Sequence, residues 1–301
     1  MSKVSFIKSD DRKYNIERCL SLIKGEIMAG IRNAKRVVIK PNCVVDNNQL
    51  AATHVDSLAA VMEFIKPYVK SQIVLAEGVG EGSTIGAFQN YGYLKLQEKY
   101  DFTITDLNND EFELIDLIDR NGKTWQAQVA KTVLDSDYLI SVSPPKTHNT
   151  VVYTGAIKNV AVGPLLRPTQ NFQTRLKSKL GISRNNKYAV HQGYAATNEN
   201  IARLYKNMPP RLCILDAYEA MEGDGPISGE MVPAHFAIAS SDPLAADWLA
   251  CHLMGIDIKD VGYLSLLDVE DVEPFVIGDD WKENVSKFKM HSDFEKMRLW
   301  K

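Results

Sequence analysis

Short apolar runs rich in β-branched residues alternate with amphipathic stretches along this chain. Arg36–Lys40, Gln72–Ala76, Asp137–Val142 and Arg211–Leu215 have the composition of buried strands, while Val55–Val69 carries apolar residues at helical spacing. Strands that alternate with helices are typical of βα units, in which the strands pair in parallel. We therefore predict an α/β fold with a mainly parallel, doubly wound sheet.

Turn residues at Asn121–Gly122 separate two further strand-like runs, Phe112–Leu117 and Trp125–Ala130. This arrangement predicts a β-hairpin added to the sheet. The sequence Ser-Asp-Pro is typical of a helix start, with Asp242 as N-cap and Pro243 as the first helical residue. Further strands are expected at Phe102–Thr105 and Ala234–Ala239, and a further helix at Asn198–Asn207.

The chain has 301 residues, of which 45% are hydrophobic, so it can bury a full core without a metal or a disulfide. We expect residues 1–301 to form a single α/β domain; the alternative is a two-lobed organisation with a boundary near residues 130–140. The four cysteines are far apart and form no CxxC pair: Cys19, Cys43, Cys213 and Cys251. No in-chain iron–sulfur cluster is therefore expected.

The overall charge and the hydropathy of the chain limit its partners. The net charge of −3 gives no general attraction to nucleic acid or to anionic lipid. The N-terminal residues lack the apolar run of a signal peptide, and no later stretch is long enough to span a membrane. We expect a cytoplasmic protein with no nucleic-acid partner and no membrane partner.

Charge is nevertheless segregated along the chain. The 61 residues between Asp137 and Glu199 contain no acidic residue, where about eight would be expected from the composition. The unopposed basic residues there are Lys146, Lys158, Arg167, Arg175, Lys177, Lys179, Arg184 and Lys187. From Leu212 to Ile258 there is no Lys or Arg, and eight acidic residues occur. The two blocks could face each other as surface ion pairs, or form an anion-binding wall opposite a carboxylate-rich wall.

In open parallel sheets, ligands bind beyond the carboxyl ends of the strands. Polar or charged residues follow most of the predicted strands: Lys40, Asn42, Glu77, Lys146, His148, Asp216 and Asp242. Lys146 and His148 lie in a predicted loop, Ser143–His148. The glycine-rich loop Gly78–Gly86, expected to lead into a helix through Leu96, could hold a phosphate with its amides, or be only a flexible connection, since it has no P-loop lysine.

Three residues of the acid-free block are candidate catalytic groups. Lys158 lies in a small, apolar stretch, where burial would lower the pKa of its amine and suit it to base, Schiff-base or anion-anchor chemistry. His148 and His191 lie on predicted loops and suit proton transfer or metal ligation. The alternative for Lys158 is a surface lysine. His235 and His252 fall within a predicted strand and helix and are expected to be structural.

The candidate ligand-binding groups fall into two sets. The predicted substrate-binding residues, which would hold an anion, are Lys40, Asn42, Lys146 and Asn159. Asp216, Glu222 and Asp224 follow a predicted strand on a glycine-rich turn, and such oxygen clusters suit a divalent metal. The alternative is that Gly-Asp-Gly-Pro is ordinary turn chemistry.

Six ordered motifs together resemble the domain of unknown function 362 family. They are VVIKPN at 37–42, PPKTH at 144–148, TGAIKN at 154–159, the later His191, MEGDGP at 221–226 after Asp216, and SDPLAAD at 241–247. Some members of that family carry a fused, cysteine-rich ferredoxin-like module, which this chain lacks. The order His148, Lys158, His191 is more distantly similar to the nickel-pincer lactate racemase family. That resemblance implies a cofactor-tethering role for Lys158 and a nickel ligand at His191.

These observations favour an enzyme that acts on a small anionic metabolite, a carboxylate or a phosphate, with a divalent metal as a candidate cofactor. The alternative is a non-catalytic binding or scaffold protein in a redox or cofactor-handling pathway, with a redox partner protein. The sequence leaves the substrate, the reaction, the identity of a metal and the oligomeric state open.

Overall fold

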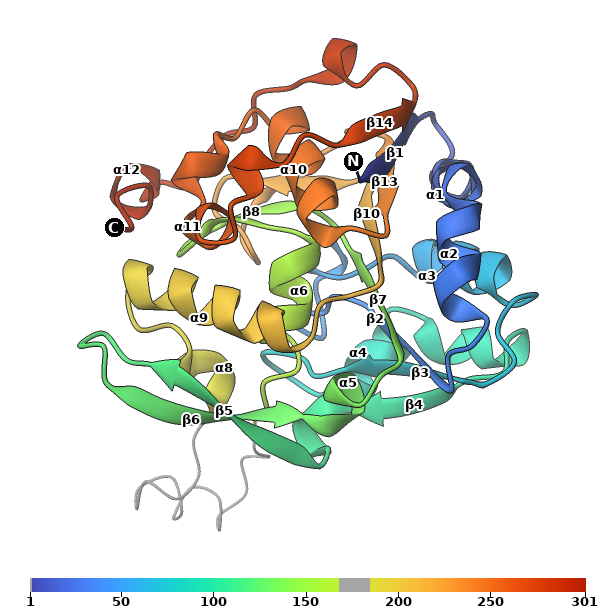
Figure 1. Ribbon diagram of the computed structural model, residues 1–301, viewed down its shortest axis with the longest axis horizontal. Helices are drawn as coiled ribbons and strands as arrows, with labels where there is room; N and C mark the ends of the chain where they lie inside the picture. The colour runs from blue at the N-terminus through green and yellow to red at the C-terminus, as the bar shows by residue number, and fades with distance from the viewer. Residues whose placement is uncertain (1, 168–184) are drawn as a thin grey trace.

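A twisted eight-stranded sheet forms the centre of the computed structural model, which describes residues 2–167 and 185–301 (Figure 1). In spatial order its strands are β14 (Phe275–Gly278), β1 (Lys3–Lys8), β13 (Phe236–Ser240), β10 (Leu212–Ala217), β7 (Tyr138–Ser143), β2 (Arg36–Lys40), β3 (Gln72–Glu77) and β4 (Thr103–Asp106). Neighbouring strands are parallel except that β13 is antiparallel to both β1 and β10. The predicted α/β class with a mainly parallel sheet is confirmed.

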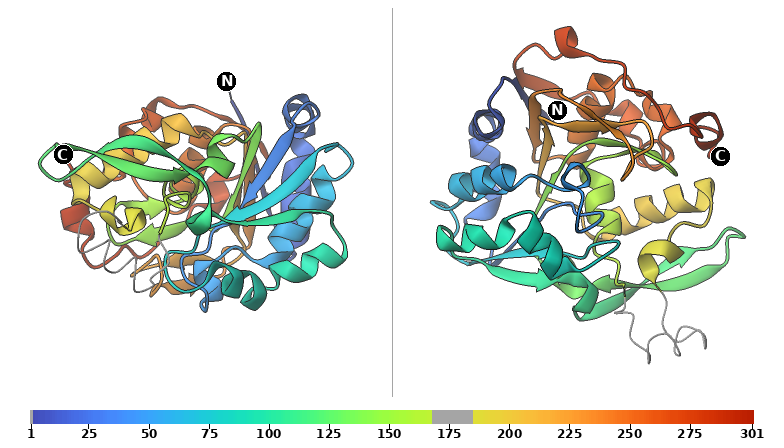
Figure 2. Two further views of the ribbon diagram at one scale, coloured as in Figure 1. Left: turned by 90° about the horizontal axis from the view of Figure 1, so that it is seen from below. Right: turned by 180° about the vertical axis from the view of Figure 1, so that it is seen from behind.

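Helices cover both faces of the sheet, because alternate residues of each strand point to opposite sides. Val37 and Ile39 of β2 belong to one hydrophobic cluster and Val38 to the other. The first face packs against α1 (Arg12–Leu22), α2 (Lys24–Ile31), α3 (Val55–Ile65) and α4 (Thr84–Asn90). The second cluster takes in residues of α6 (Ala156–Val162), α9 (Tyr194–Asn207), α10 (Pro243–Leu253) and α11 (Gly262–Ser265). Figure 2 shows these two groups of helices from two further sides.

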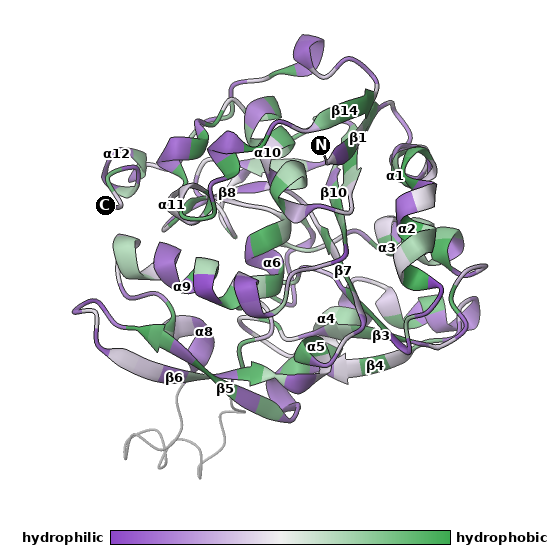
Figure 3. Cartoon of the chain, in the orientation of Figure 1, coloured by the Kyte–Doolittle hydropathy of each residue, from purple (hydrophilic) through white to green (hydrophobic). Residues whose placement is uncertain are grey.

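The remaining described elements are short. They are the helices α5 (Lys131–Leu134), α8 (Asn186–Ala189) and α12 (Phe294–Met297), and 3-10 turns at Gln49–Ala51, Tyr93–Glu98, Leu107–Asn109, Ile258–Asp260, Val269–Asp271 and Lys282–Asn284. Figure 3 shows that the central strands are largely hydrophobic, whereas α9 alternates between hydrophobic and hydrophilic residues. Among the described residues, none of the helices combines the length and the apolar character needed to cross a bilayer. The single-domain organisation stays a prediction.

Two smaller sheets flank the central one. The predicted hairpin is confirmed as β5 (Phe112–Ile118) and β6 (Thr124–Ala130), with Gly122 at a φ of 76° in the turn. The other sheet has the order β12 (Glu230–Val232), β11 (Ala220–Glu222), β8 (Lys146–His148) and β9 (Val152–Thr154). The prediction that Ser143–His148 is entirely loop is therefore wrong. Its last three residues form a strand because they pair with β9 and with the distant β11, a pairing that local sequence does not reveal.

Two predicted helices end earlier than expected. The helix predicted over Val55–Val69 ends at Ile65. Lys66 still has helical backbone angles and its amide donates to the Met62 carbonyl, but Pro67 has no amide hydrogen with which to continue the helical hydrogen bonds. The helix predicted to run through Leu96 ends at Asn90, because Gly92 adopts a left-handed φ of 79° and a 3-10 turn follows. The predicted start of α10 is confirmed, since the Asp242 carboxylate accepts a hydrogen bond from the Leu244 amide and Pro243 follows it.

The buried carboxylate of Asp247, on α10, holds the first turn of α6. Its oxygens accept hydrogen bonds from the Ala156 amide at 2.8 Å, the Ile157 amide at 3.0 Å and the Tyr153 hydroxyl at 3.0 Å. Burial raises the pKa of Asp247 to about 6. The chain approaches so closely that a Cβ on Gly155 would lie 2.4 Å from the Asp247 Oδ1 atom. Asp247 therefore takes the place of a local N-cap and fixes the direction in which α6 leaves the sheet.

We predict that Asp247→Ala lowers the free energy of unfolding by about 3 kcal/mol, because three charge-assisted hydrogen bonds are lost in a buried site. Asp242→Ala, which removes the N-cap of α10, the helix that carries Asp247, should lower the free energy of unfolding by only about 1 kcal/mol. Urea denaturation followed by circular dichroism measures both values. Equal losses in the two variants would contradict a special role for Asp247.

Candidate functional site

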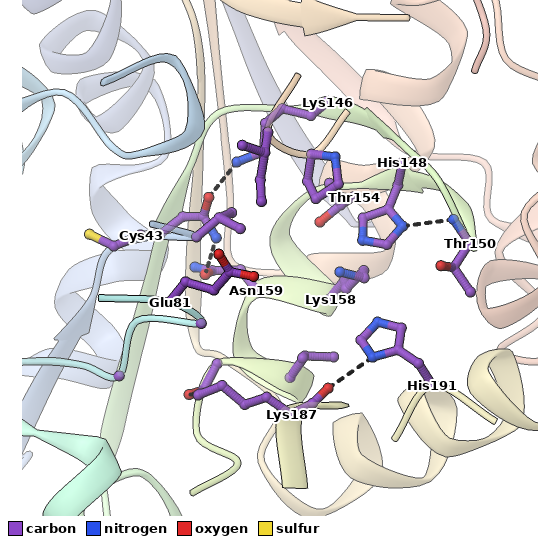
Figure 4. Close-up of a pocket in the computed structure, with 18 of the residues that line it drawn as sticks. Cys43, Glu81, Lys146, His148, Thr150, Thr154, Lys158, Asn159, Lys187 and His191 are labelled. Atoms are coloured by element: carbon purple, nitrogen blue, oxygen red, sulfur yellow. Dashed lines mark hydrogen bonds between the residues drawn. The ribbon is translucent and has the colours of Figure 1, made fainter. Parts of the chain in front are cut away.

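A cavity of about 370 Å³ lies beyond the carboxyl ends of β2 and β3, where sheets of this class bind ligands (Figure 4). Its walls come from the loops after those strands, from β8, from α6 and from the region of α8. The structure brings all the predicted catalytic and substrate-binding residues to its lining: Lys40, Asn42, Lys146, His148, Lys158, Asn159 and His191. These residues are separated by up to about 150 positions in the sequence, so the fold assembles the cavity.

Lys40 is buried at the end of β2 and is fully engaged with the protein. Its Nζ atom donates hydrogen bonds at 2.9 Å to Glu77 Oε2, to the Pro41 carbonyl and to Asn159 Oδ1. The Glu77 carboxylate also accepts from the amides of Cys43, at 3.1 Å, and Gly78, at 2.7 Å. A lysine ammonium has three N–H groups, and in this geometry all three are directed at protein acceptors; the predicted contact of Lys40 with an anion stays a prediction.

Two asparagines connect this ion pair to the neighbouring lysine. Asn159 donates to the Ser141 hydroxyl at 3.0 Å and its oxygen accepts from Asn42 Nδ2 at 3.3 Å. The Asn42 oxygen in turn accepts a short hydrogen bond from Lys146 Nζ, which lies 3.4 Å from the Ala51 carbonyl. Asn42 and Asn159 thus join Lys40 and Lys146 in one hydrogen-bond network along the cavity wall.

Three further lysines are buried around the cavity: Lys146, Lys158 and Lys187. Burial lowers the pKa of each to about 7, and for Lys146 the nearby charge of Lys158 is the next largest cause. Lys187 Nζ donates to the Gly163 carbonyl. Across residues 2–167 and 185–301, Lys158 Nζ has no hydrogen-bond or ion-pair partner, although its side chain is only 9% exposed.

The two histidines of the cavity are in opposite neutral tautomers. His148 Nδ1 accepts a hydrogen bond from the Thr150 amide at 3.0 Å, so in the neutral ring Nε2 carries the proton. His191 Nδ1 lies 2.8 Å from the Lys187 carbonyl, which can only accept, so its Nε2 carries the lone pair. The rings are nearly parallel, with an interplanar angle of 4° and centroids 6.3 Å apart.

Both rings are neutral at physiological pH. Burial, followed by the charge of Lys158, lowers the pKa of His191 to about 4 and holds the pKa of His148 well below its ordinary value. In Figure 4, Lys158 lies beside the two imidazoles, with Lys146 and Lys187 further away on either side of it. The cavity therefore combines an N–H donor, a nitrogen lone pair and three amines, a set suited to holding an anion and moving a proton on it.

The glycine-rich loop lies at the rim of the cavity, but its amides are occupied. Gly78 and Gly80 line the cavity. The Gly78 amide donates to Glu77 and the Gly80 amide to the Val44 carbonyl at 3.0 Å, while the Ser83 amide donates to Asp46 at 2.8 Å. These bonds leave the predicted phosphate cradle without free donors at those three positions.

The three carboxylates predicted to hold a metal are not among the residues that line the cavity. Asp216 accepts from the Ser57 hydroxyl at 2.5 Å and pairs with Arg12 at 3.2 Å. The Glu222 carboxylate accepts from the Lys289 amide at 2.8 Å, and that of Asp224 from the Ser292 amide at 3.4 Å. In the part of the chain that the structure describes, no three His, Cys, Asp or Glu side chains group as metal ligands, so these donors do not fit a metal and we derive no step through one.

The acidic residues between Leu212 and Ile258 form their ion pairs with residues outside the basic block. Arg12 pairs with Glu219 at 2.6 Å as well as with Asp216, and Lys289 pairs with Glu230 at 2.8 Å. Within the described ranges, no ion pair links the two blocks. Four of the basic residues lie outside the described residues: Arg175, Lys177, Lys179 and Arg184.

Two important residues of the cavity were not singled out as site residues from the sequence. Lys187 was one of several basic residues in the acid-free block, and its adjacency to His191 in the fold was the missing information. Glu77 was recognised only as a polar residue at a strand end. Its pairing with Lys40 follows from the parallel contact of β2 and β3, which places the ends of these strands side by side. His235 and His252 are not among the residues that line the cavity; His235 stacks on Tyr218, and His252 contacts the Trp248 ring at an interplanar angle of 31°.

Three comparisons relate the chain to known proteins. A family model described as a domain of unknown function (DUF362) matches residues 37–252. The thylakoid-associated protein sll1697 of Synechocystis sp. (strain ATCC 27184 / PCC 6803 / Kazusa) is 22% identical over 231 residues, which cover 75% of this chain and 65% of that protein. The lactate racemase apoprotein of Thermoanaerobacterium thermosaccharolyticum is 15% identical with a TM-score of 0.49, over 87% of this chain and 58% of that one. The chain thus spans less than two thirds of either protein.

We predict opposite effects on stability when two cavity lysines are replaced by methionine. Lys40→Met should lower the free energy of unfolding by about 3 to 5 kcal/mol, because Glu77 is left as a buried, unpaired charge. Lys158→Met should raise it by about 1 to 3 kcal/mol, because an amine without a partner is replaced by an apolar chain of similar length. Chemical denaturation measures both.

The gain in Lys158→Met should also depend on pH. Because the folded-state pKa of Lys158 lies near 7 and its ordinary value is 10.5, burial of the charge costs most below pH 7. The gain should therefore be largest there and diminish as the pH rises toward 10.5. If Lys158→Met had a lower free energy of unfolding than the wild-type protein at every pH, the Lys158 amine would have a stabilising partner and the prediction would be wrong.

Proposed function

This chain belongs to the DUF362 family, and we propose that it is an enzyme that binds a small anionic metabolite in the lysine-lined cavity and transfers a proton on it. One observation carries the proposal: in residues 2–167 and 185–301, three buried lysines without a carboxylate partner and two histidines of opposite tautomer line a single cavity. Location in the cytoplasm and association with a redox partner protein stay predictions.

The charge balance of the cavity supports an anionic ligand. Two carboxylates are among the residues that line it in the described part of the chain. Glu77 is neutralised by Lys40, and Glu81 accepts a hydrogen bond from the Tyr188 hydroxyl at 2.6 Å. An entering anion would supply the missing counter-charge for Lys146, Lys158 and Lys187 and raise the pKa of each amine.

The histidine pair supports proton transfer in addition to binding. The Lys187 carbonyl orients the His191 ring so that Nε2 carries the lone pair. Nε2 can therefore accept a proton from a bound molecule. His148 Nε2–H can donate a hydrogen bond to an oxygen on which negative charge develops. A protein that only stored an anion would need the lysines but not two imidazoles with complementary tautomers.

We predict that small carboxylates and phosphate stabilise the wild-type protein against heat, with malonate, lactate and inorganic phosphate as probes. The rise in Tm should be largest at about pH 6 and shrink toward about pH 9, because only protonated amines hold an anion and the free pKa values lie near 7. Lys158→Ala should lose most of the rise. A matched control, Lys123→Ala in the exposed hairpin turn, should keep it.

The same rise in Tm in wild type and Lys158→Ala would contradict anion binding at this amine. A rise that grew with pH would contradict binding by the lowered-pKa lysines, since their charge falls over that range.

Catalysis, as distinct from binding, is tested by hydrogen exchange in D2O. We predict that the wild-type protein exchanges the carbon-bound hydrogen next to the carboxyl or carbonyl group of at least one probe among lactate, malate and pyruvate. His191→Gln should slow the exchange by about 100-fold or more, because the proton acceptor is lost, while the anion-dependent rise in Tm persists. Proton NMR measures the exchange. Stabilisation by anions without exchange of any probe would favour the non-catalytic binding protein instead.

A further inference from the structure

We infer that the amine of Lys158 forms a Schiff base with the carbonyl group of a small 2-oxo acid bound in the cavity. This inference rests on the proposed anion-binding function and adds to it a covalent step and a substrate class. The observations that carry it are the free amine of Lys158, the two histidines beside it and the two cationic groups that flank the cavity.

Among the described residues, Lys158 differs from the other three cavity lysines in that its amine has no hydrogen-bond acceptor. Lys40 donates to three acceptors, Lys146 to Asn42 and Ala51, and Lys187 to Gly163. Within the described ranges Lys158 has no such acceptor, yet it is buried and lines the cavity. Burial, and then the charge of Lys40, lowers its pKa to about 7, so a large fraction of the amine carries a lone pair at neutral pH.

The histidines supply what imine formation requires. The step joins Lys158 Nζ to the carbonyl carbon as the C=O π bond opens onto oxygen. Both amine protons then move to that oxygen, one of them by way of the His191 Nε2 lone pair, and the C–O bond breaks with the loss of water. His148 Nε2–H donates a hydrogen bond to the same oxygen while it carries negative charge. Amine and carbonyl compound are converted to imine and water, so no oxidant or reductant is needed.

The flanking lysines favour an oxo acid over an uncharged aldehyde or ketone. Figure 4 places Lys146 and Lys187 on opposite sides of Lys158. A carboxylate next to the carbonyl group could pair with either ammonium while the carbonyl carbon faces the Lys158 amine. A protonated imine would in turn withdraw electrons from the neighbouring carbon, where His191 could remove a proton.

Reductive trapping tests this inference on the full-length protein. Wild-type protein is incubated with pyruvate and sodium cyanoborohydride at neutral pH, digested, and mapped by mass spectrometry. We expect Lys158 to gain the mass of pyruvic acid less one oxygen atom, at least about tenfold faster than any exposed lysine, because an ordinary lysine is almost wholly protonated at that pH. With pyruvate at saturation, the rate should rise with pH as the Lys158 amine loses its proton.

Two controls separate the parts of the inference. Acetone has the same carbonyl group without the carboxylate and should label Lys158 at least about tenfold more slowly than pyruvate; equal rates would overturn the assignment to oxo acids. Lys123→Met, in the exposed turn, should leave the labelling of Lys158 unchanged, and a loss of labelling there would count against a reaction confined to the cavity.

Failure of the Schiff base is distinguishable from failure of the proposed function. If Lys158 is not labelled although malonate still raises the Tm of the wild-type protein, the cavity binds anions and the covalent step is wrong. If neither labelling nor stabilisation is seen, the proposed function fails as well. Because the site of labelling is mapped in the wild-type protein, the result does not depend on the folding of a variant.

Discussion

Four lysine side chains are buried together around the cavity beyond the carboxyl ends of β2 and β3, and the chemistry of the cavity depends on how their charge is balanced. A buried ammonium group must find a counter-charge or lose its proton. Within residues 2–167 and 185–301, Lys40 alone among the four has a carboxylate partner, Glu77. Burial moves the pKa of Lys146, Lys158 and Lys187 to about 7. A fold that concentrates unbalanced amines in this way sacrifices stability, as proteins do where a ligand supplies the missing charge.

The fold explains how these amines come together while, among the described residues, only Lys40 forms an ion pair with a carboxylate. The parallel contact of β2 and β3 brings Lys40 beside Glu77, and Asn159 extends this ion pair to α6. The carboxylate of Asp247 fixes the first turn of α6 from the opposite side, so Lys158 leaves the helix at a defined place. The acidic block, in contrast, pairs mainly with Arg12 and Lys289, away from the cavity lining. The carboxylates of the acidic block that form these ion pairs therefore lie outside the cavity lining.

Much of the fold could be predicted from local pattern. The strand at Arg36–Lys40, the hairpin and the N-cap at Asp242 are each encoded by a few neighbouring residues, and all three are confirmed. The short strand β8 could not be predicted, because it depends on pairing with β11 some 75 positions later. For the same reason β1 and β14, from opposite ends of the chain, were not expected beside one another.

Sequence could select residues that line the cavity, but not the contacts that each of them makes. A run without acidic residues and a set of polar strand ends were enough to select seven of the residues that line the cavity. Sequence could not show that Lys40 is fully paired while Lys158 has no partner in the described part of the chain, since these states depend on contacts between distant segments. The opposite tautomers of His148 and His191 likewise depend on which backbone group each ring meets. The carboxylates at 216–224 had a plausible metal spacing, but each is engaged by a different neighbour.

The proposed function requires that the buried lysines, part of which are neutral at neutral pH, become charged when an anion enters the cavity. Isothermal titration calorimetry of malonate binding at about pH 8, repeated in two buffers of different ionisation enthalpy, counts the protons exchanged with solvent on binding. We expect a net uptake of protons by the wild-type protein, because amines with a pKa near 7 must be protonated to hold the anion. Malonate binding with the same apparent enthalpy in both buffers, and hence no proton uptake, would contradict it.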